Sequence, residues 1–150
     1  MKKQRMNRRG VKLLAVILSI AAVSATADVT ISARVLSTGG GAAKARGTSL
    51  RAAEKEMASV LDVDSCAVVA SGRKSVGVNG SFSLTYAHGR QGRITPIAEQ
   101  NGRVTVKIAW ELPSGKKWKK TLAFKRGMES MVGGPAASGG GKYLLSLRIQ

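Results

Sequence analysis

The residues that could carry out nucleophilic or metal chemistry are few. The chain has one histidine, His88, and one cysteine, Cys66. A hydrolytic triad needs a base beside its nucleophile, and the glycine-containing turn at residues 88–90 predicts an exposed loop position for His88. Zinc takes three or four Cys or His ligands, so these two residues exclude a site of that kind. Cys66 is interpreted as a small core residue, and a single cysteine cannot form an internal disulfide.

The carboxylates are scattered along the chain. Asp62 and Asp64 lack the ligand pattern of a calcium loop and indicate a helix end and a turn. Glu99 and Glu111 flank a predicted hairpin, but their spacing does not favour the paired acids of a glycoside hydrolase over solvated strand positions. Residues 136–143 lack the first glycine and the Ser or Thr of a phosphate-binding loop. We therefore expect no catalytic residue, no metal and no cofactor, and a small envelope hydrolase using scattered carboxylates is the alternative function.

Positive charge is the strongest chemical signal in the sequence. The chain holds 25 Lys and Arg against 8 Asp and Glu, a formal net charge of +17. The candidate anion-binding residues surround Trp118 or lie in nearby turns: Lys116, Lys117, Lys119, Lys120, Lys125, Arg126, Arg90, Arg93 and Arg103. A basic surface of this kind attracts lipid headgroups, lipopolysaccharide phosphates and acidic glycans. The competing interpretation is that the lysines protect an exposed edge strand from aggregation.

Alternation along residues 116–124 predicts which of these side chains face solvent. Successive residues of a strand face opposite sides, so Lys117, Lys119 and Lys125 should point outward and Trp118 toward the core. Lys116 and Lys120 share the face of Trp118 and must lie near a strand end or an edge to reach water. The sequence has no helix-turn-helix, basic helix or aromatic-rich platform, which argues against sequence-specific nucleic-acid binding. The expected partner is an envelope protein or an anionic surface.

The elements that must position these side chains are mostly strands. Period-two alternation predicts about eight short strands, at residues 29–35, 65–70, 74–78, 82–86, 94–99, 104–112, 116–124 and 143–149. Asn79-Gly80 is a strong two-residue hairpin signal, and residues 100–103 and 113–115 predict further turns. Residues 131–135 and the glycine-rich segment after them are assigned to no strand.

One helix is predicted, at residues 49–61, with Thr48 placed to cap it. Its apolar stripe is formed by Leu50, Ala53, Met57, Val60 and Leu61, and Glu54 is assigned to the polar face. The predicted fold class is α+β, mainly antiparallel β with one amphipathic helix. Residues 28–150 should form a single basic domain.

The N-terminus predicts export. Its first twelve residues carry basic but no acidic side chains, and residues 13–23 form an apolar run. This pattern, followed by small residues up to Ala27, is typical of a signal peptide cleaved between Ala27 and Asp28. A run of about eleven residues is too short to span a ~30 Å hydrocarbon core, so we expect no transmembrane segment in the mature chain. The paired arginines Arg8 and Arg9 leave a twin-arginine signal as an alternative, and the basic leader before Val11 leaves a prepilin.

The C-terminal third has a family resemblance. A lysine-rich strand, Gly127, residues 131–135, a glycine loop and the apolar strand at 143–149 resemble the closing hairpins of secretin-type outer-membrane proteins and of small exported bacterial proteins with the same arrangement. The resemblance covers about fifty residues of generic hairpin chemistry. The long membrane-inserting strands of a secretin are missing, so it implies a soluble relative that pairs with such an assembly rather than a pore. We therefore expect a periplasmic or secreted, non-catalytic envelope protein.

Overall fold

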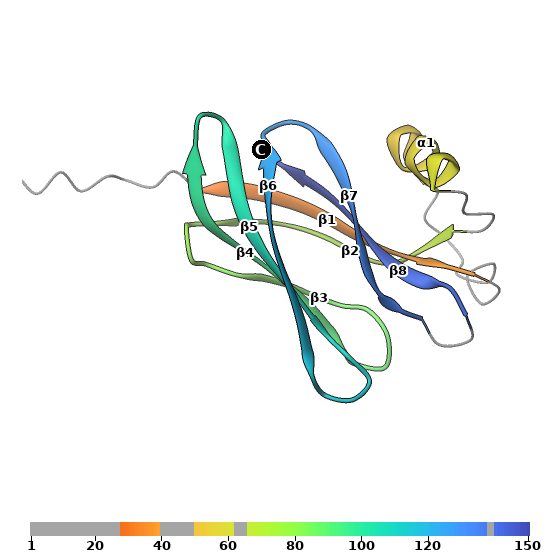
Figure 1. The fold of residues 1–150 in the computed structure, drawn as a ribbon. Coiled ribbons are helices and arrows are strands. Elements are labelled where there is room, and N and C mark those ends of the chain that lie inside the picture. The colour runs from red at the N-terminus through yellow and green to blue at the C-terminus, as the bar shows by residue number, and fades with distance from the viewer. Residues whose placement is uncertain (1–27, 40–49, 62–65, 138–139) are drawn as a thin grey trace, which may run out of the picture.

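The computed structural model describes residues 28–39, 50–61, 66–137 and 140–150. It contains one helix and eight strands: β1 Val29–Thr38, α1 Ala52–Val60, β2 Cys66–Val76, β3 Phe82–Thr85, β4 Gln91–Gln100, β5 Arg103–Glu111, β6 Lys117–Lys125, β7 Glu129–Ala136 and β8 Lys142–Ile149. The strands form two antiparallel sheets, sheet A in the order β2-β1-β8-β7 and sheet B in the order β3-β4-β5-β6 (Figure 1). The predicted fold class, mainly antiparallel β with one helix, is confirmed.

The two sheets pack face to face around one hydrophobic core. Alternate residues of the central strands supply it, with Ile31 and Val35 from β1, Ile108 and Trp110 from β5, and Leu147 from β8. Each of these side chains is buried because period-two alternation places it on the inner face of its sheet. The opposite faces of both sheets are consequently left for other contacts, and those two outer faces differ.

The hairpin between β4 and β5 follows the sequence prediction. Gln100 pairs with Arg103 across the two-residue turn Asn101-Gly102, whose φ angles are 51° and 71°. Positive φ at both central positions is the geometry that matches the twist of the flanking strands, and Asn-Gly adopts it readily. The following turn, between β5 and β6, also lies where the sequence places it, and Gly115 N–H donates to the carbonyl of Leu112 at 2.9 Å.

The Asn79-Gly80 turn is present, but its predicted hairpin is wrong. Gly80 N–H donates to the carbonyl of Gly77 at 2.9 Å, and Asn79 has a φ of 67°. However, β2 pairs with β1 and β3 pairs with β4, so this turn carries the chain from one sheet to the other. The two strands predicted at 65–70 and 74–78 are one long strand, because β2 follows β1 along its whole length through a bulge at Val35/Leu36.

Residues 131–135 lie in a strand that the sequence analysis did not assign. They belong to β7, which pairs with β8 at the edge of sheet A. Pro135 lacks a backbone N–H, and an edge strand tolerates that loss. Gly134 is required by packing, since a Cβ added there would lie 3.0 Å from Cζ2 of Trp110. The glycines and proline that suggested a loop are therefore features of a strand packed closely against an indole ring.

Helix α1 packs on the outer face of sheet A through a face that only partly matches the predicted apolar stripe. Its buried residues are Glu54 and Ala58, whereas Val60 is 81% exposed and Leu61 is also exposed. Arg51, rather than the predicted Thr48, occupies the N-cap, and its backbone N–H donates to Glu54 Oε2 at 2.8 Å. Leu50, Ala53 and Met57 of the predicted stripe are half-buried, but the most deeply buried residue of the helix is the charged Glu54.

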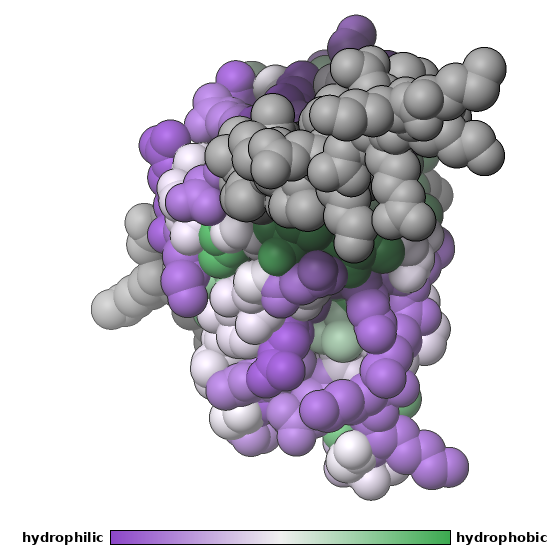
Figure 2. Space-filling model, turned by 90° about the vertical axis from the view of Figure 1, so that its left-hand side faces the viewer, coloured by the Kyte–Doolittle hydropathy of each residue, from purple (hydrophilic) through white to green (hydrophobic). Residues whose placement is uncertain are grey.

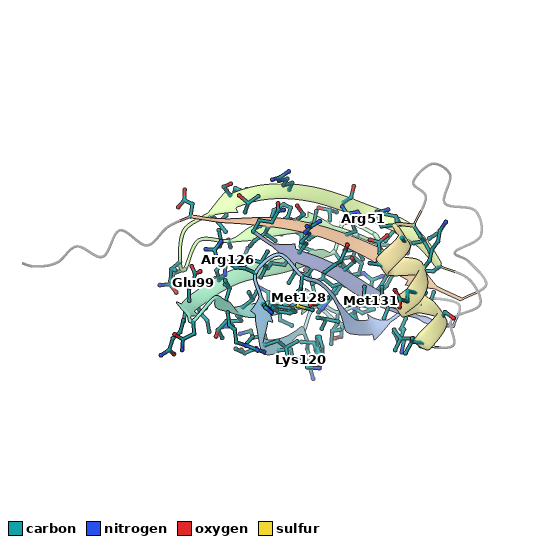
Figure 3. All side chains as sticks on the ribbon, turned by 90° about the horizontal axis from the view of Figure 1, so that it is seen from above. Arg51, Glu99, Lys120, Arg126, Met128 and Met131 are labelled. Atoms are coloured by element: carbon teal, nitrogen blue, oxygen red, sulfur yellow. The ribbon has the colours of Figure 1, made fainter. Side chains whose placement is uncertain are left out.

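A buried ion pair holds α1 in place. Arg34 on β1 lies 3.1 Å from Glu54, with side chains 6% and 0% exposed. Beside it, Arg51 pairs with Glu129 on β7 at 2.8 Å, and Ser146 Oγ donates to the same carboxylate oxygen at 3.0 Å. Figure 3 places Arg51 and Met131 together at the side of the sandwich next to the helix. Beneath helix α1 the outer face of sheet A is thus covered and Arg34 and Arg51 are paired, whereas Arg73 and Arg148, on either side of Ser32 in the register, are exposed on the same face.

Several sequence predictions concern residues outside the described ones, namely the signal peptide at 1–27, the cap Thr48, and Asp62 and Asp64. Asp28 is the first described residue and directly precedes β1. Within the part of the chain that the structure describes, no helix has the length and apolar character needed to cross a membrane.

Candidate anion-binding face

The outer face of sheet B gathers most of the predicted anion-binding residues. Lys117, Lys119 and Lys125 alternate with core-facing residues along β6 and are exposed, as the sequence predicted. Arg103 pairs directly across from Lys125. Arg93 on β4 is exposed on the same face, so cations from three neighbouring strands share one surface.

The strand register arranges these cations in rows across the sheet. One row runs Arg93, Ala109, Lys119, so that a small side chain separates two cations. The next row places Lys107 between Thr95 and Thr121. Neighbouring strands lie about 4.8 Å apart, which brings the long basic side chains of adjacent strands within reach of one ligand.

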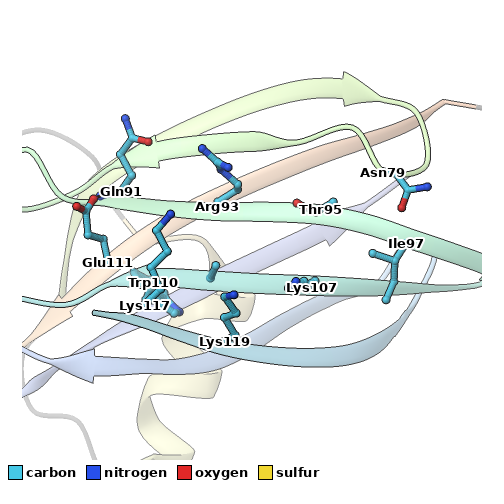
Figure 4. Close-up of a pocket in the computed structure, with 11 residues that line it drawn as sticks. Asn79, Gln91, Arg93, Thr95, Ile97, Lys107, Trp110, Glu111, Lys117 and Lys119 are labelled. Atoms are coloured by element: carbon cyan, nitrogen blue, oxygen red, sulfur yellow. Dashed lines mark hydrogen bonds between the residues drawn. The ribbon is translucent and has the colours of Figure 1, made fainter. Parts of the chain in front are cut away.

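A groove of about 420 Å³ lies over these rows. Its lining residues come from β4, β5, β6 and the Asn79 turn: Asn79, Gln91, Arg93, Thr95, Ile97, Lys107, Ala109, Trp110, Glu111, Lys117 and Lys119. Figure 4 shows Lys117 and Lys119 extending from β6 toward β5. Because three lysines and an arginine line it, the groove can hold an anionic group between flexible cationic arms.

Glu111 is the one carboxylate on this outer face within strands β3 to β6. It accepts a hydrogen bond from the backbone N–H of Gln91 at 3.2 Å and lies opposite Lys117 in the register. The groove therefore has one mixed end, near Glu111, and one purely basic end, near Lys107 and Lys119. An anion is favoured at the basic end.

Two of the predicted arginines lie elsewhere and have partners. Arg126, in the turn after β6, donates through Nη2 to Glu99 Oε2 at 2.7 Å. This hydrogen bond holds the pKa of Glu99 below and that of Arg126 above their usual values. Arg90 donates to the carbonyl of Ala87 at 3.1 Å and lies 5.7 Å from the centre of the Tyr86 ring. Both arginines stabilise turns and do not join the basic face.

Lys120 and Trp118 point to the core side of β6, as alternation predicted. Trp118 pairs with Trp110 in the register, but it is 36% exposed whereas Trp110 is fully buried. Trp118 therefore faces the core as predicted but is only partly buried, because β6 is the edge of sheet B and is incompletely covered on its inner side. Lys120 reaches water at that edge (Figure 3), and inward-pointing charge on an edge strand opposes pairing with another chain. Lys116 lies in the turn before β6 and is exposed.

The groups able to perform catalysis are dispersed in the described structure. His88 is exposed in the β3–β4 turn with a φ of 52°, as predicted. Cys66 is half-buried, and burial together with the nearby Glu54 carboxylate raises the pKa of its thiol, which keeps the thiol protonated at neutral pH. Within the described residues, no three His, Cys, Asp or Glu side chains lie close enough to hold a metal ion.

Sequence reasoning missed Lys107 and Glu111 as part of this face. Both lie on β5 at outward positions, alternating with Val106, Ile108 and Trp110. The signal was present in that alternation, but their place beside the β6 lysines follows from the pairing of Lys107 with Thr121 and of Glu111 with Lys117.

Hydrophilic side chains also dominate the end of the sandwich from which β1 starts. Figure 2 looks onto that end and shows them over most of the described surface, with a narrower hydrophobic band below the grey atoms.

The search for similar proteins matched no family model, no curated protein and no solved structure. Function must therefore be inferred from the geometry of the molecule, and the resemblance to secretin hairpins stays a hypothesis.

Proposed function

We propose that this chain is an exported, non-catalytic cell-envelope protein that binds an anionic surface through the outer face of sheet B. The observation that carries the proposal is the set of exposed cations on that face, where Glu111 is the one outward-facing carboxylate of β3 to β6: Arg93, Arg103, Lys107, Lys117, Lys119 and Lys125. A surface with this charge distribution attracts phosphate-rich lipids and lipopolysaccharide.

The availability of these charges supports the proposal. The ion pairs within the described residues join Arg34 to Glu54, Arg51 to Glu129 and Arg126 to Glu99. None of those arginines belongs to the set on the outer face of sheet B. The cations of that set consequently keep their charge for an external partner.

Vesicle binding tests the proposal. The variant Lys117→Gln/Lys119→Gln/Lys125→Gln should bind vesicles containing phosphatidylglycerol at least about tenfold more weakly than the native protein, because juxtaposed cations contribute about 1 kcal/mol each near an anionic membrane. Native binding should fall steeply with added salt, since screening limits the reach of charge to roughly 8 Å at physiological ionic strength. A sedimentation assay with neutral and anionic vesicles measures both effects.

The matched control removes the same charge elsewhere. Lys55, Lys74 and Lys142 are exposed on α1, β2 and β8, so the variant Lys55→Gln/Lys74→Gln/Lys142→Gln has the same net charge as the test variant. The control should keep most of the native affinity. Equal losses in both variants would show that net charge alone drives binding, and an unchanged affinity in the test variant would favour protein pairing at the sheet edge instead.

Export is tested separately by intact mass. The proposal expects the protein recovered from the envelope of a bacterial host to begin at Asp28, having lost residues 1–27. Mass spectrometry of the purified protein measures this directly. A retained leader would contradict cleavage and favour an anchored or pilin-like product.

A further inference from the structure

The groove on sheet B has a floor that is unlike the rest of the face. Its centre is the methyl group of Ala109, flanked in the register by Arg93 on β4 and Lys119 on β6. Along β5 itself, Lys107 lies two residues away, a separation of about 6.8 Å in a strand. A small residue surrounded by three longer cationic ones leaves a depression with positive charge on its walls.

The dimensions fit a charged group rather than an extended surface. Adjacent strands are about 4.8 Å apart, so the Cα atoms of Arg93 and Lys119 are separated by roughly twice that distance. Basic side chains on either side of Ala109 can therefore meet a single tetrahedral anion from opposite sides. Glu111 lies at the other end of the groove, so the anion is favoured toward Lys107 and Lys119.

The remaining lining groups suit hydroxyls. At the Lys107 end, Asn79 and Thr95 line the groove beside the cations, whereas Gln91 lies at the opposite end beside Glu111 (Figure 4). Amide and hydroxyl side chains both donate and accept hydrogen bonds, which is what a sugar ring presents and requires. The volume of about 420 Å³ exceeds what one phosphate needs and lies in the range of small-ligand pockets, about 300–1,000 Å³.

The groove offers no exposed aromatic surface. Trp110 is its single aromatic lining residue, and the indole is fully buried on the inner side of the sheet. Non-specific binding of single-stranded nucleic acid depends on bases stacked on aromatic rings. The lining thus favours a phosphorylated sugar over a nucleic-acid strand.

We infer that this groove, defined by Ala109 and the side chains around it, is a site for a phosphorylated sugar unit of an envelope glycan. Lys107 and Lys119 hold the phosphate over Ala109, with Arg93 closing the row, and Thr95 and Asn79 bind the ring hydroxyls. The inference builds on the proposed function, because it assigns one ligand class to the same basic face.

Titration with small probes tests the inference. The purified protein is titrated with glucose 1-phosphate, inorganic phosphate, glucose and a short oligothymidylate, and the amide signals of β4 and β5 are followed by nuclear magnetic resonance. Glucose 1-phosphate should shift the amides of Thr95 and Ala109 and bind about tenfold more tightly than inorganic phosphate, since its ring hydroxyls add hydrogen bonds that inorganic phosphate lacks. Glucose alone should cause no shift.

Substitution of Ala109 distinguishes a site of defined shape from non-specific electrostatic attraction. Ala109→Leu fills the depression without changing charge, and should weaken glucose 1-phosphate binding about tenfold while leaving the binding of anionic vesicles unchanged. The matched control is Ala123→Leu, at an exposed position of the same face on β6, which should leave both kinds of binding unchanged. Circular dichroism confirms that both variants are folded.

Different experimental results would overturn this inference and the proposed function. Equal binding of glucose 1-phosphate and inorganic phosphate, or an unchanged affinity in Ala109→Leu, would overturn the sugar-phosphate site while vesicle binding still depended on Lys117, Lys119 and Lys125. Tighter binding of the oligothymidylate than of glucose 1-phosphate at equal charge would overturn it in favour of nucleic acid. Vesicle binding that is insensitive to the lysine substitutions would instead overturn the proposed function.

Discussion

Positive charge has different surroundings on sheet A beneath helix α1 and on the outer face of sheet B. On sheet A, Arg34 lies beneath helix α1 and pairs with the buried carboxylate of Glu54. On sheet B, Lys107, Lys117 and Lys119 stand on an open groove and belong to none of the ion pairs formed within the described residues. The charge of a buried cation must be balanced by a partner inside the protein, whereas an exposed cation is hydrated and stays available to a ligand.

This difference indicates where stability and binding are located. The covered face of sheet A contains a chain of contacts from Arg34 through Glu54 to the helix, and from Arg51 through Glu129 to Ser146. Loss of one partner there leaves a charge in a poorly solvated environment. On the open face of sheet B, loss of one lysine leaves only a change in surface charge. Substitutions at the two faces should therefore have unequal effects on folding.

The largest effect is expected from the core that both sheets share. Trp110 is fully buried and packs against Tyr86 at 5.1 Å between ring centres. Trp110→Ala should lower the free energy of unfolding by about 3–5 kcal/mol, as large core truncations do. Urea denaturation followed by circular dichroism measures the loss. Trp118→Ala is the control, because its exposed ring should cost clearly less, and an equal cost would mean that the inner side of β6 is covered.

The next effect concerns the covered face of sheet A. Glu54→Gln keeps the size of the side chain but removes the negative charge that faces the buried Arg34 at 3.1 Å, so the free energy of unfolding should fall by about 3 kcal/mol. Glu56→Gln is the matched control, since Glu56 is exposed on the same helix, and it should change stability by less than about 0.5 kcal/mol. Equal effects of the two substitutions in urea denaturation would show that α1 is not held by the ion pair.

The sequence predicted the fold class and most strands because alternation is a local signal. The β4–β5 hairpin could be placed from Asn101-Gly102, since both residues of that turn adopt the positive φ it requires. Pairing between strands is not local. Asn79-Gly80 has the same sequence signal, yet it joins strands of different sheets because β2 continues along β1.

The candidate site was predicted in part for the same reason. Alternation along β6 placed Lys117, Lys119 and Lys125 outward, and the structure agrees. Lys107 joined them only through the register of β5 with β6, which depends on tertiary pairing. Glu54 was misassigned to a polar helix face because its partner, Arg34, is distant in sequence and its contact appears only after folding.

The smallest effect is expected on the open face of sheet B, and it is the sharpest test of the contrast between the two faces. Substitution of Lys117, Lys119 and Lys125 by Gln removes three charges, yet exposed charges contribute about 0–1 kcal/mol each to folding. Here the sign can even be favourable, because the chain has a net charge of +17 and removal of like charge reduces self-repulsion. The free energy of unfolding should therefore stay within about 1 kcal/mol of the native value, and added salt should narrow the difference because it screens that repulsion. If the triple variant instead lost as much stability as Glu54→Gln, these lysines would be structural, and the open face would resemble the covered one.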